Sequence, residues 1–190
     1  ELYYRKDEMQ QRLLSLIELV NSFESDPDRD QNEGLNYYFM LSGAYYNDKN
    51  YKQALIYYKR LLEQSVKLNS TSFYYFGVHG VVRCLSNLKQ YAAAMTILKK
   101  ANLQFKEKNT QQEAIIVSSM LKVYLLMNRM QDAKSLIPKF NEIFNRYRNE
   151  TEQDFSYYAI DNYLVFYDSL PSYYLQLEDW GKLAEELKIM

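Results

Sequence analysis

The pattern of apolar and polar positions predicts helices along nearly the whole chain. Residues 2–23 carry apolar side chains every three or four positions, which is the spacing of one helix face. The same period returns in later segments, separated by short polar stretches such as the acidic segment 25–34, which contains a proline and a glycine and is expected to be a loop. We therefore expect one helix followed by helix pairs at 35–68, 73–107, 111–148 and 152–188.

A short motif recurs in the second half of each pair. An aromatic or large apolar residue is followed three places later by a small one, and then by large ones again. The small residues Ala54, Ala94 and Ala133 lie 40 and 39 residues apart (94 − 54 and 133 − 94), and a fourth copy aligns at Leu183. Such a period, with two helices per unit, is typical of an α-solenoid. The small residue is needed because two helices cross closely at that point.

Residues 38–61 resemble a tetratricopeptide repeat. The matching positions are Tyr38, where the family has Trp, Leu41, Ser42 in place of Gly, Tyr45, Ala54, Tyr58 and Leu61. Weaker copies are carried by Val78, Val81, Leu85, Tyr91, Ala94, Leu98 and Ala101, by Val117, Met120, Tyr124, Ala133, Ile137 and Phe140, and by Tyr167, Leu170, Tyr174, Trp180 and Leu183.

The resemblance implies an all-α, right-handed superhelix of about four helix pairs, forming a single domain over residues 1–190. Residues 2–23 would be the second helix of an incomplete first unit. The family's usual unit is about 34 residues long. The longer unit of this chain resembles those of bacterial peptide-pheromone receptors and of sensor regions in bacterial signalling proteins. We therefore expect this chain to be a fragment of a larger bacterial signalling or regulatory protein.

Composition and charge narrow the function classes. The net charge is −1, which argues against binding nucleic acid by neutralising phosphates. No apolar run is long enough to span a membrane. Five Gly and three Pro are few for a β or α/β fold. The single cysteine excludes an intrachain disulfide, which leaves the compartment open between cytoplasm and periplasm.

No catalytic or cofactor-binding constellation is visible. His79 is the only histidine and Cys84 the only cysteine, and their spacing of five does not place them together on a helix face. One His and one Cys do not make a zinc site, and no glycine-rich phosphate loop occurs. We therefore expect no catalytic residues, no metal and no cofactor, and an enzyme is the least favoured class.

The resemblance also implies a binding surface. In the family, the first helix of each unit lines a concave groove that holds a protein or peptide segment. The positions that would face this groove are Asn36, Phe39, Met40, Tyr46, Phe76, His79, Arg83, Ser118 and Lys122. Arg83 and Lys122 are the candidates to meet a carboxylate, since charge-assisted hydrogen bonds are the stronger ones. The alternative is a structural or homodimerising scaffold without a peptide ligand.

Overall fold

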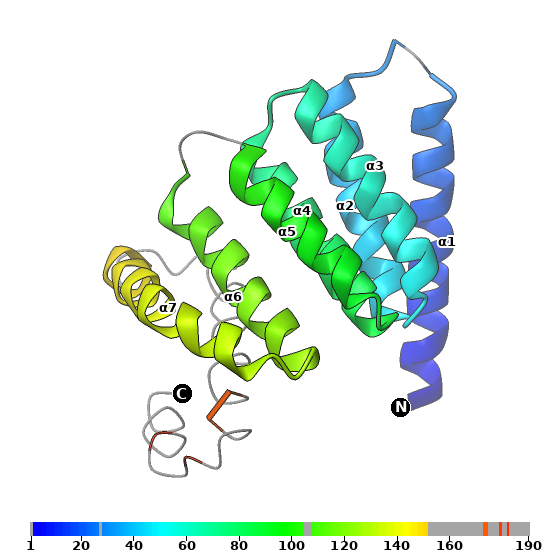
Figure 1. Cartoon of the computed structure of the whole chain (residues 1–190). Coiled ribbons are helices and arrows are strands. Elements are labelled where there is room, and N and C mark those ends of the chain that lie inside the picture. The colour runs from blue at the N-terminus through cyan, green and yellow to red at the C-terminus, as the bar shows by residue number, and fades with distance from the viewer. Residues whose placement is uncertain are drawn as a thin grey trace. The chain divides into compact units, whose positions relative to one another are not determined.

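The computed structural model describes residues 2–26, 28–104, 108–151, 173–174, 179 and 182. Every regular element among them is a helix, so the described part of the chain is all-α (Figure 1). The helices are α1 (Leu2–Glu24), α2 (Gln31–Asn47), α3 (Tyr51–Lys67), α4 (Thr71–Asn87), α5 (Tyr91–Gln104), α6 (Thr110–Leu126) and α7 (Met130–Thr151). Among these described residues, no helix has the length and apolar character needed to cross a membrane.

The chain forms two compact units, residues 1–90 and 91–190. The first contains α1 to α4 and the second contains α5 to α7. The expected helix pair at 73–107 spans the boundary between the units. The expected pair at 152–188 lies almost entirely outside the described residues.

Within the first unit, each helix packs on the next one along the chain. α2 packs against both α1 and α3, α3 packs against α4, and α2 also contacts α4 (Figure 1). Leu16 and Val20 of α1 form a buried cluster with Leu41 of α2. The helix face predicted for residues 2–23 is therefore the face that α1 buries.

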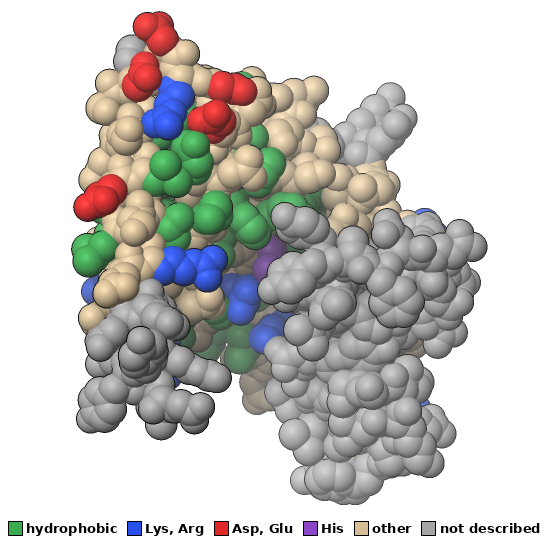
Figure 2. Space-filling model, turned by 180° about the vertical axis from the view of Figure 1, so that it is seen from behind, with side chains coloured by type: hydrophobic (Ala, Val, Ile, Leu, Met, Phe, Trp, Pro, Cys, Tyr) green, Lys and Arg blue, Asp and Glu red, His purple; other side chains and the backbone are tan. Residues whose placement is uncertain are grey.

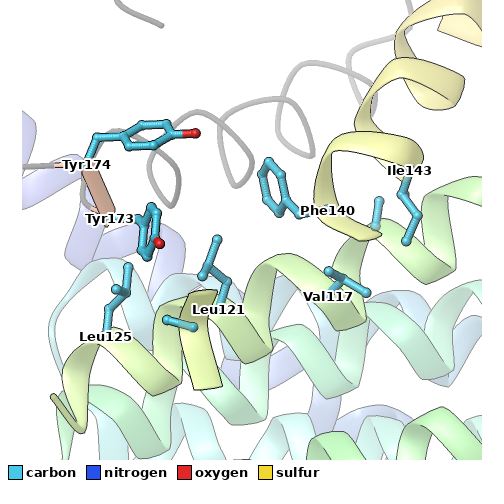
Figure 3. Packing of buried hydrophobic residues seen from close by; sticks show 9 residues of the cluster. Val117, Leu121, Leu125, Phe140, Ile143, Tyr173 and Tyr174 are labelled. Atoms are coloured by element: carbon cyan, nitrogen blue, oxygen red, sulfur yellow. The ribbon is translucent and has the colours of Figure 1, made fainter. Parts of the chain in front are cut away.

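The three alanines of the repeat are fully buried. Ala54 in the first unit, and Ala94 and Ala133 in the second, each have 0% of their surface exposed. Around Ala133, the side chains of α6 and α7 form one apolar cluster with Tyr173 and Tyr174 (Figure 3). These positions therefore hold small side chains because neighbouring atoms surround them on all sides, as the sequence predicted.

The same turn ends four of the described helices, α2, α3, α4 and α6. In each turn one residue adopts a positive φ, and its amide donates to the carbonyl three residues earlier while the next amide donates to the carbonyl five residues earlier. At the first turn these bonds are Lys49 N to Tyr46 O (3.0 Å) and Asn50 N to Tyr45 O (2.9 Å). This is the Schellman pattern. The positive-φ residues are Lys49, Asn69, Lys89 and Asn128.

These turns repeat with the period of the alanines. Lys49 and Lys89 lie 40 residues apart, and Asn128 follows Lys89 by 39 (89 − 49 and 128 − 89). Asn69 lies midway between the two lysines, so the turn also recurs once per helix. The backbone therefore carries the same two-helix period as the side chains.

Replacing Lys49 with glycine is expected to raise the free energy of unfolding by roughly 1 kcal/mol. The φ of Lys49 is 60°, where a side chain with a Cβ is strained and glycine is not. Chemical denaturation monitored by circular dichroism measures the change. Lys49→Val is the opposing control, because a β-branched residue tolerates this φ least, and it should lower stability. A gain in stability with valine would contradict this view of the turn.

The segment 25–34 is not wholly a loop, and the prediction was wrong there. α2 begins at Gln31, because Asp30 caps it by accepting a hydrogen bond from the amide of Asn32 at 2.9 Å. Gly34 lies inside the helix and is buried against Phe23 of α1. A Cβ on Gly34 would lie 2.3 Å from the Phe23 Cζ atom. This glycine therefore serves a close helix contact and does not form a turn.

Candidate binding face on α2 and α4

α4 is buried over most of its circumference and leaves one stripe less buried. Between its second and last residues, the exposed or half-buried positions are Ser72, Phe73, Phe76, His79, Arg83, Ser86 and Asn87. They recur every three or four residues, which places them on one side of the helix. α2 is less buried overall, and its exposed or half-buried positions include Asn36, Met40, Gly43 and Asn47, which have the same spacing.

The two stripes and the rings between them define the α2–α4 face. Its residues are Asn36, Phe39, Met40 and Tyr46 of α2, and Phe73, Phe76, His79, Arg83 and Asn87 of α4. Figure 2 shows this side of the molecule: hydrophobic side chains gather on it, with Lys and Arg side chains and the histidine close by and acidic side chains gathered toward one end.

Three half-buried phenylalanines link the two helices. The Phe39 ring lies 5.6 Å from the Phe76 ring and 6.3 Å from the Phe73 ring, and Phe73 and Phe76 are 6.3 Å apart. Phe73 meets each of the other two edge to face, an arrangement that aromatic pairs prefer. Since each ring keeps part of its surface accessible, the trio offers an apolar site with a fixed shape.

A cation lies further along the same face. The guanidinium carbon of Arg83 sits 4.1 Å from the centre of the Tyr46 ring. Asn87 donates hydrogen bonds from Nδ2 to the Tyr46 hydroxyl (3.0 Å) and to the Arg83 carbonyl (2.9 Å). These bonds hold the tyrosine ring in place, and the ring in turn orients the guanidinium. Arg83 itself is exposed.

The two helices are in a constant register along this face. Phe39 meets Phe76 and Tyr46 meets Arg83, and both pairs are separated by 37 residues in the sequence (76 − 39 and 83 − 46). An equal offset at two successive contacts means that α2 and α4 run in the same direction side by side. The aromatic and cationic sites are therefore two turns apart on both helices.

Tyr58 of α3 lies between these helices from the buried side. A Cβ on Gly80 of α4 would lie 2.2 Å from the Tyr58 ring, and one on Gly43 of α2 would lie 4.0 Å from its hydroxyl. Burial raises the pKa of Tyr58 to about 12, and a hydrogen bond with Ser42 opposes part of that rise. Tyr58 is 6% exposed, so its ring forms the floor of the α2–α4 face.

The structure brings together seven of the predicted groove residues. They lie on neighbouring stripes of the first unit and are Asn36, Phe39, Met40, Tyr46, Phe76, His79 and Arg83. Asn36, Met40 and Arg83 are exposed and the other four are half-buried. Phe73 was not among the predicted groove residues, although its position three residues before Phe76 places it on the same stripe.

The other two predicted residues belong to the second unit. Ser118 is 1% exposed, and its hydroxyl donates to the Ala114 carbonyl of its own helix at 2.7 Å. Lys122 is exposed on α6. The α2–α4 face is therefore built without them.

Cys84 is fully buried, and burial raises the pKa of its thiol to about 12, so the thiol stays protonated near neutral pH. No three His, Cys, Asp or Glu side chains in the described ranges gather in a way that could hold a metal ion.

Comparison of the chain with protein-family models, with curated proteins and with solved structures found no match.

Proposed function

We propose that this chain is a non-catalytic binding module of tetratricopeptide-like helix hairpins, which holds a protein or peptide segment along the α2–α4 face. The observation that carries the proposal is the combination of partly exposed aromatic rings with an oriented cation on one continuous stripe. Such a wall meets apolar side chains and a charged group of a ligand at the same time. Ordinary solvated helix surfaces carry mostly scattered polar side chains.

The repeat arrangement is part of the proposal. It is supported by the buried alanines and by the Schellman turns, which share one period. It is also supported by the contact between α2 and α4, which are the first helices of successive hairpins in this scheme. Stacked hairpins present their first helices side by side, and a binding stripe then arises from the packing itself. A sensor or adaptor role within a larger bacterial signalling protein fits such a module.

Peptides selected from a displayed random library should bind the protein, and binding should fall at least about tenfold in Met40→Glu. Met40 is 43% exposed on the α2–α4 face, so the change adds charge to the stripe without opening the core. Ile56→Glu is the matched control, because Ile56 is 45% exposed on α3.

The proposal fails if the library yields no binders, or if Ile56→Glu weakens binding as much as Met40→Glu. A mass that rises with protein concentration in sedimentation experiments, and returns to the monomer in Met40→Glu, would instead assign this face to self-association.

A further inference from the structure

Arginine side chains repeatedly stack on tyrosine rings in this chain. In the described ranges, four arginines lie within 5.9 Å of a tyrosine ring centre: Arg29 on Tyr37, Arg60 on Tyr57, Arg83 on Tyr46 and Arg129 on Tyr124. A planar guanidinium lying on a ring still has N–H groups at its edge, and these suit a carboxylate.

Three of the four arginines have that carboxylate within the chain. Arg29 pairs with Glu33 at 3.5 Å and Arg129 pairs with Asp132 at 2.8 Å. Arg60 pairs with Glu24 of α1. Arg83 is the exception, because no acidic side chain of the described residues lies within ion-pair distance of it, although its stack on Tyr46 is the closest of the four.

We infer that the ligand of the α2–α4 face supplies a carboxylate to Arg83: the ligand is an extended segment that places an acidic side chain on Arg83 and an apolar side chain on Phe39, Phe73 and Phe76. This inference rests on the proposed function and specifies the chemistry of its ligand. Each of the three phenylalanines keeps part of its ring surface accessible, and an apolar side chain of the ligand would remove some of that surface from water.

The spacing of the two sites sets the spacing in the ligand. Seven residues separate Phe76 from Arg83 on α4, and the same number separates Phe39 from Tyr46 on α2 (83 − 76 and 46 − 39). At about 1.5 Å per helical residue, the two sites are about 10.5 Å apart. An extended chain in the polyproline II conformation advances about 3.1 Å per residue with about three residues per turn, so the acidic residue lies about three positions from the apolar one and on the same side of the ligand.

The width of the face favours an extended chain over a helix. α2 and α4 are in contact, and the Phe39 and Phe76 rings fill the space between them at 5.6 Å. A ligand helix, about 10 Å wide, needs an open channel to bury one of its faces. An extended chain in the polyproline II conformation can lie along the ridge of rings with every third side chain directed at it.

Charge along the face favours an internal acidic side chain over a chain terminus. Beyond Arg83, the turns that end α2 and α4 carry exposed Lys49 and Lys89 and one exposed acid, Asp48, so the net charge there is positive. The opposite end of α2 carries Asp30 and Glu33 together with Arg29, which pairs with Glu33. A ligand with its acidic residues toward the Arg83 end therefore places them near positive charge and away from Asp30 and Glu33. The reverse placement would bring the ligand's acidic residues close to Asp30 and Glu33.

Labelled peptides of about twelve residues test this inference by fluorescence anisotropy. Each peptide is acetylated at its N-terminus and amidated at its C-terminus. Its sequence is Gly and Ser apart from one Phe and one Glu three positions away. One version has the Phe first and the other has the Glu first. Matched probes carry Gln in place of Glu, Ser in place of Phe, or a free C-terminal carboxylate in place of the Glu. We expect a Glu probe to bind at least about tenfold more tightly than its Gln version, with the difference shrinking in high salt.

In Arg83→Gln the Glu and Gln probes should bind equally. Arg129→Gln is the control, because it removes another arginine that stacks on tyrosine but is already paired, and it should keep the difference. Arg83→Lys should retain only part of the difference in affinity between the Glu and Gln probes, since an ammonium lacks the planar edge of a guanidinium. Melting temperatures of the variants show that they remain folded.

Equal binding of Glu and Gln probes by the unchanged protein would overturn the inference and leave the proposed function standing, provided that the Ser-for-Phe probe binds less well. Tighter binding of the free-terminus probe would overturn the choice of an internal side chain. Failure of every probe to bind would count against both the inference and the proposed function.

Discussion

Tyr58→Ala is expected to lower the free energy of unfolding by about 3–5 kcal/mol, the range for removing a large buried ring. The ring is 6% exposed and lies between Gly43 of α2 and Gly80 of α4. Its loss would leave a cavity beneath the α2–α4 face that three packed helices cannot close. Urea unfolding monitored by circular dichroism measures the effect.

Tyr58→Phe is the matched control. It keeps the ring and removes only the hydroxyl that hydrogen-bonds with Ser42, which is worth about 1 kcal/mol. If the alanine variant costs no more than the phenylalanine variant, Tyr58 does not fill the space between α2 and α4, and the floor of the face has been misassigned.

The second large effect concerns two glycines that both lie near Tyr58. Gly80→Ala is expected to destabilise the protein by about 1–3 kcal/mol, because its Cβ would lie 2.2 Å from the buried Tyr58 ring. Gly43→Ala is expected to stabilise it by up to about 1 kcal/mol, because alanine favours helices and the nearest atom would be 4.0 Å away.

The test is whether the two substitutions change the stability of the protein in opposite directions. Both substitutions add the same methyl group to a helix in contact with Tyr58, so helix propensity alone would make both stabilising. Thermal unfolding of the two variants side by side therefore measures the close packing at Gly80 directly. Equal gains in stability would contradict a close contact between α4 and Tyr58.

Periodicity predicted the helices and the small-residue positions because both depend on local spacing. The buried state of Ala54, Ala94 and Ala133 follows from a side-chain pattern that the first three copies repeat. The helix of residues 2–23 was predicted for the same reason, since apolar side chains at i, i+3 and i+4 lie on one face of a helix.

Features that depend on a partner helix were harder to predict. Gly34 looks like a turn residue in the sequence, and only the Phe23 ring packed against it explains a glycine inside α2. The Arg83–Tyr46 stack joins residues on different helices, so no local pattern signals it.

The most direct measurement of the central claim is the side-chain Nε–Hε correlation of Arg83 in a ¹⁵N NMR spectrum, recorded while a Glu probe is titrated in. The account predicts that the Arg83 signal moves with the same saturation curve as the anisotropy, that the Arg129 signal stays in place, and that the Gln probe leaves both unchanged. A bound Glu probe with an unmoved Arg83 signal, or an equal shift with the Gln probe, would contradict the account.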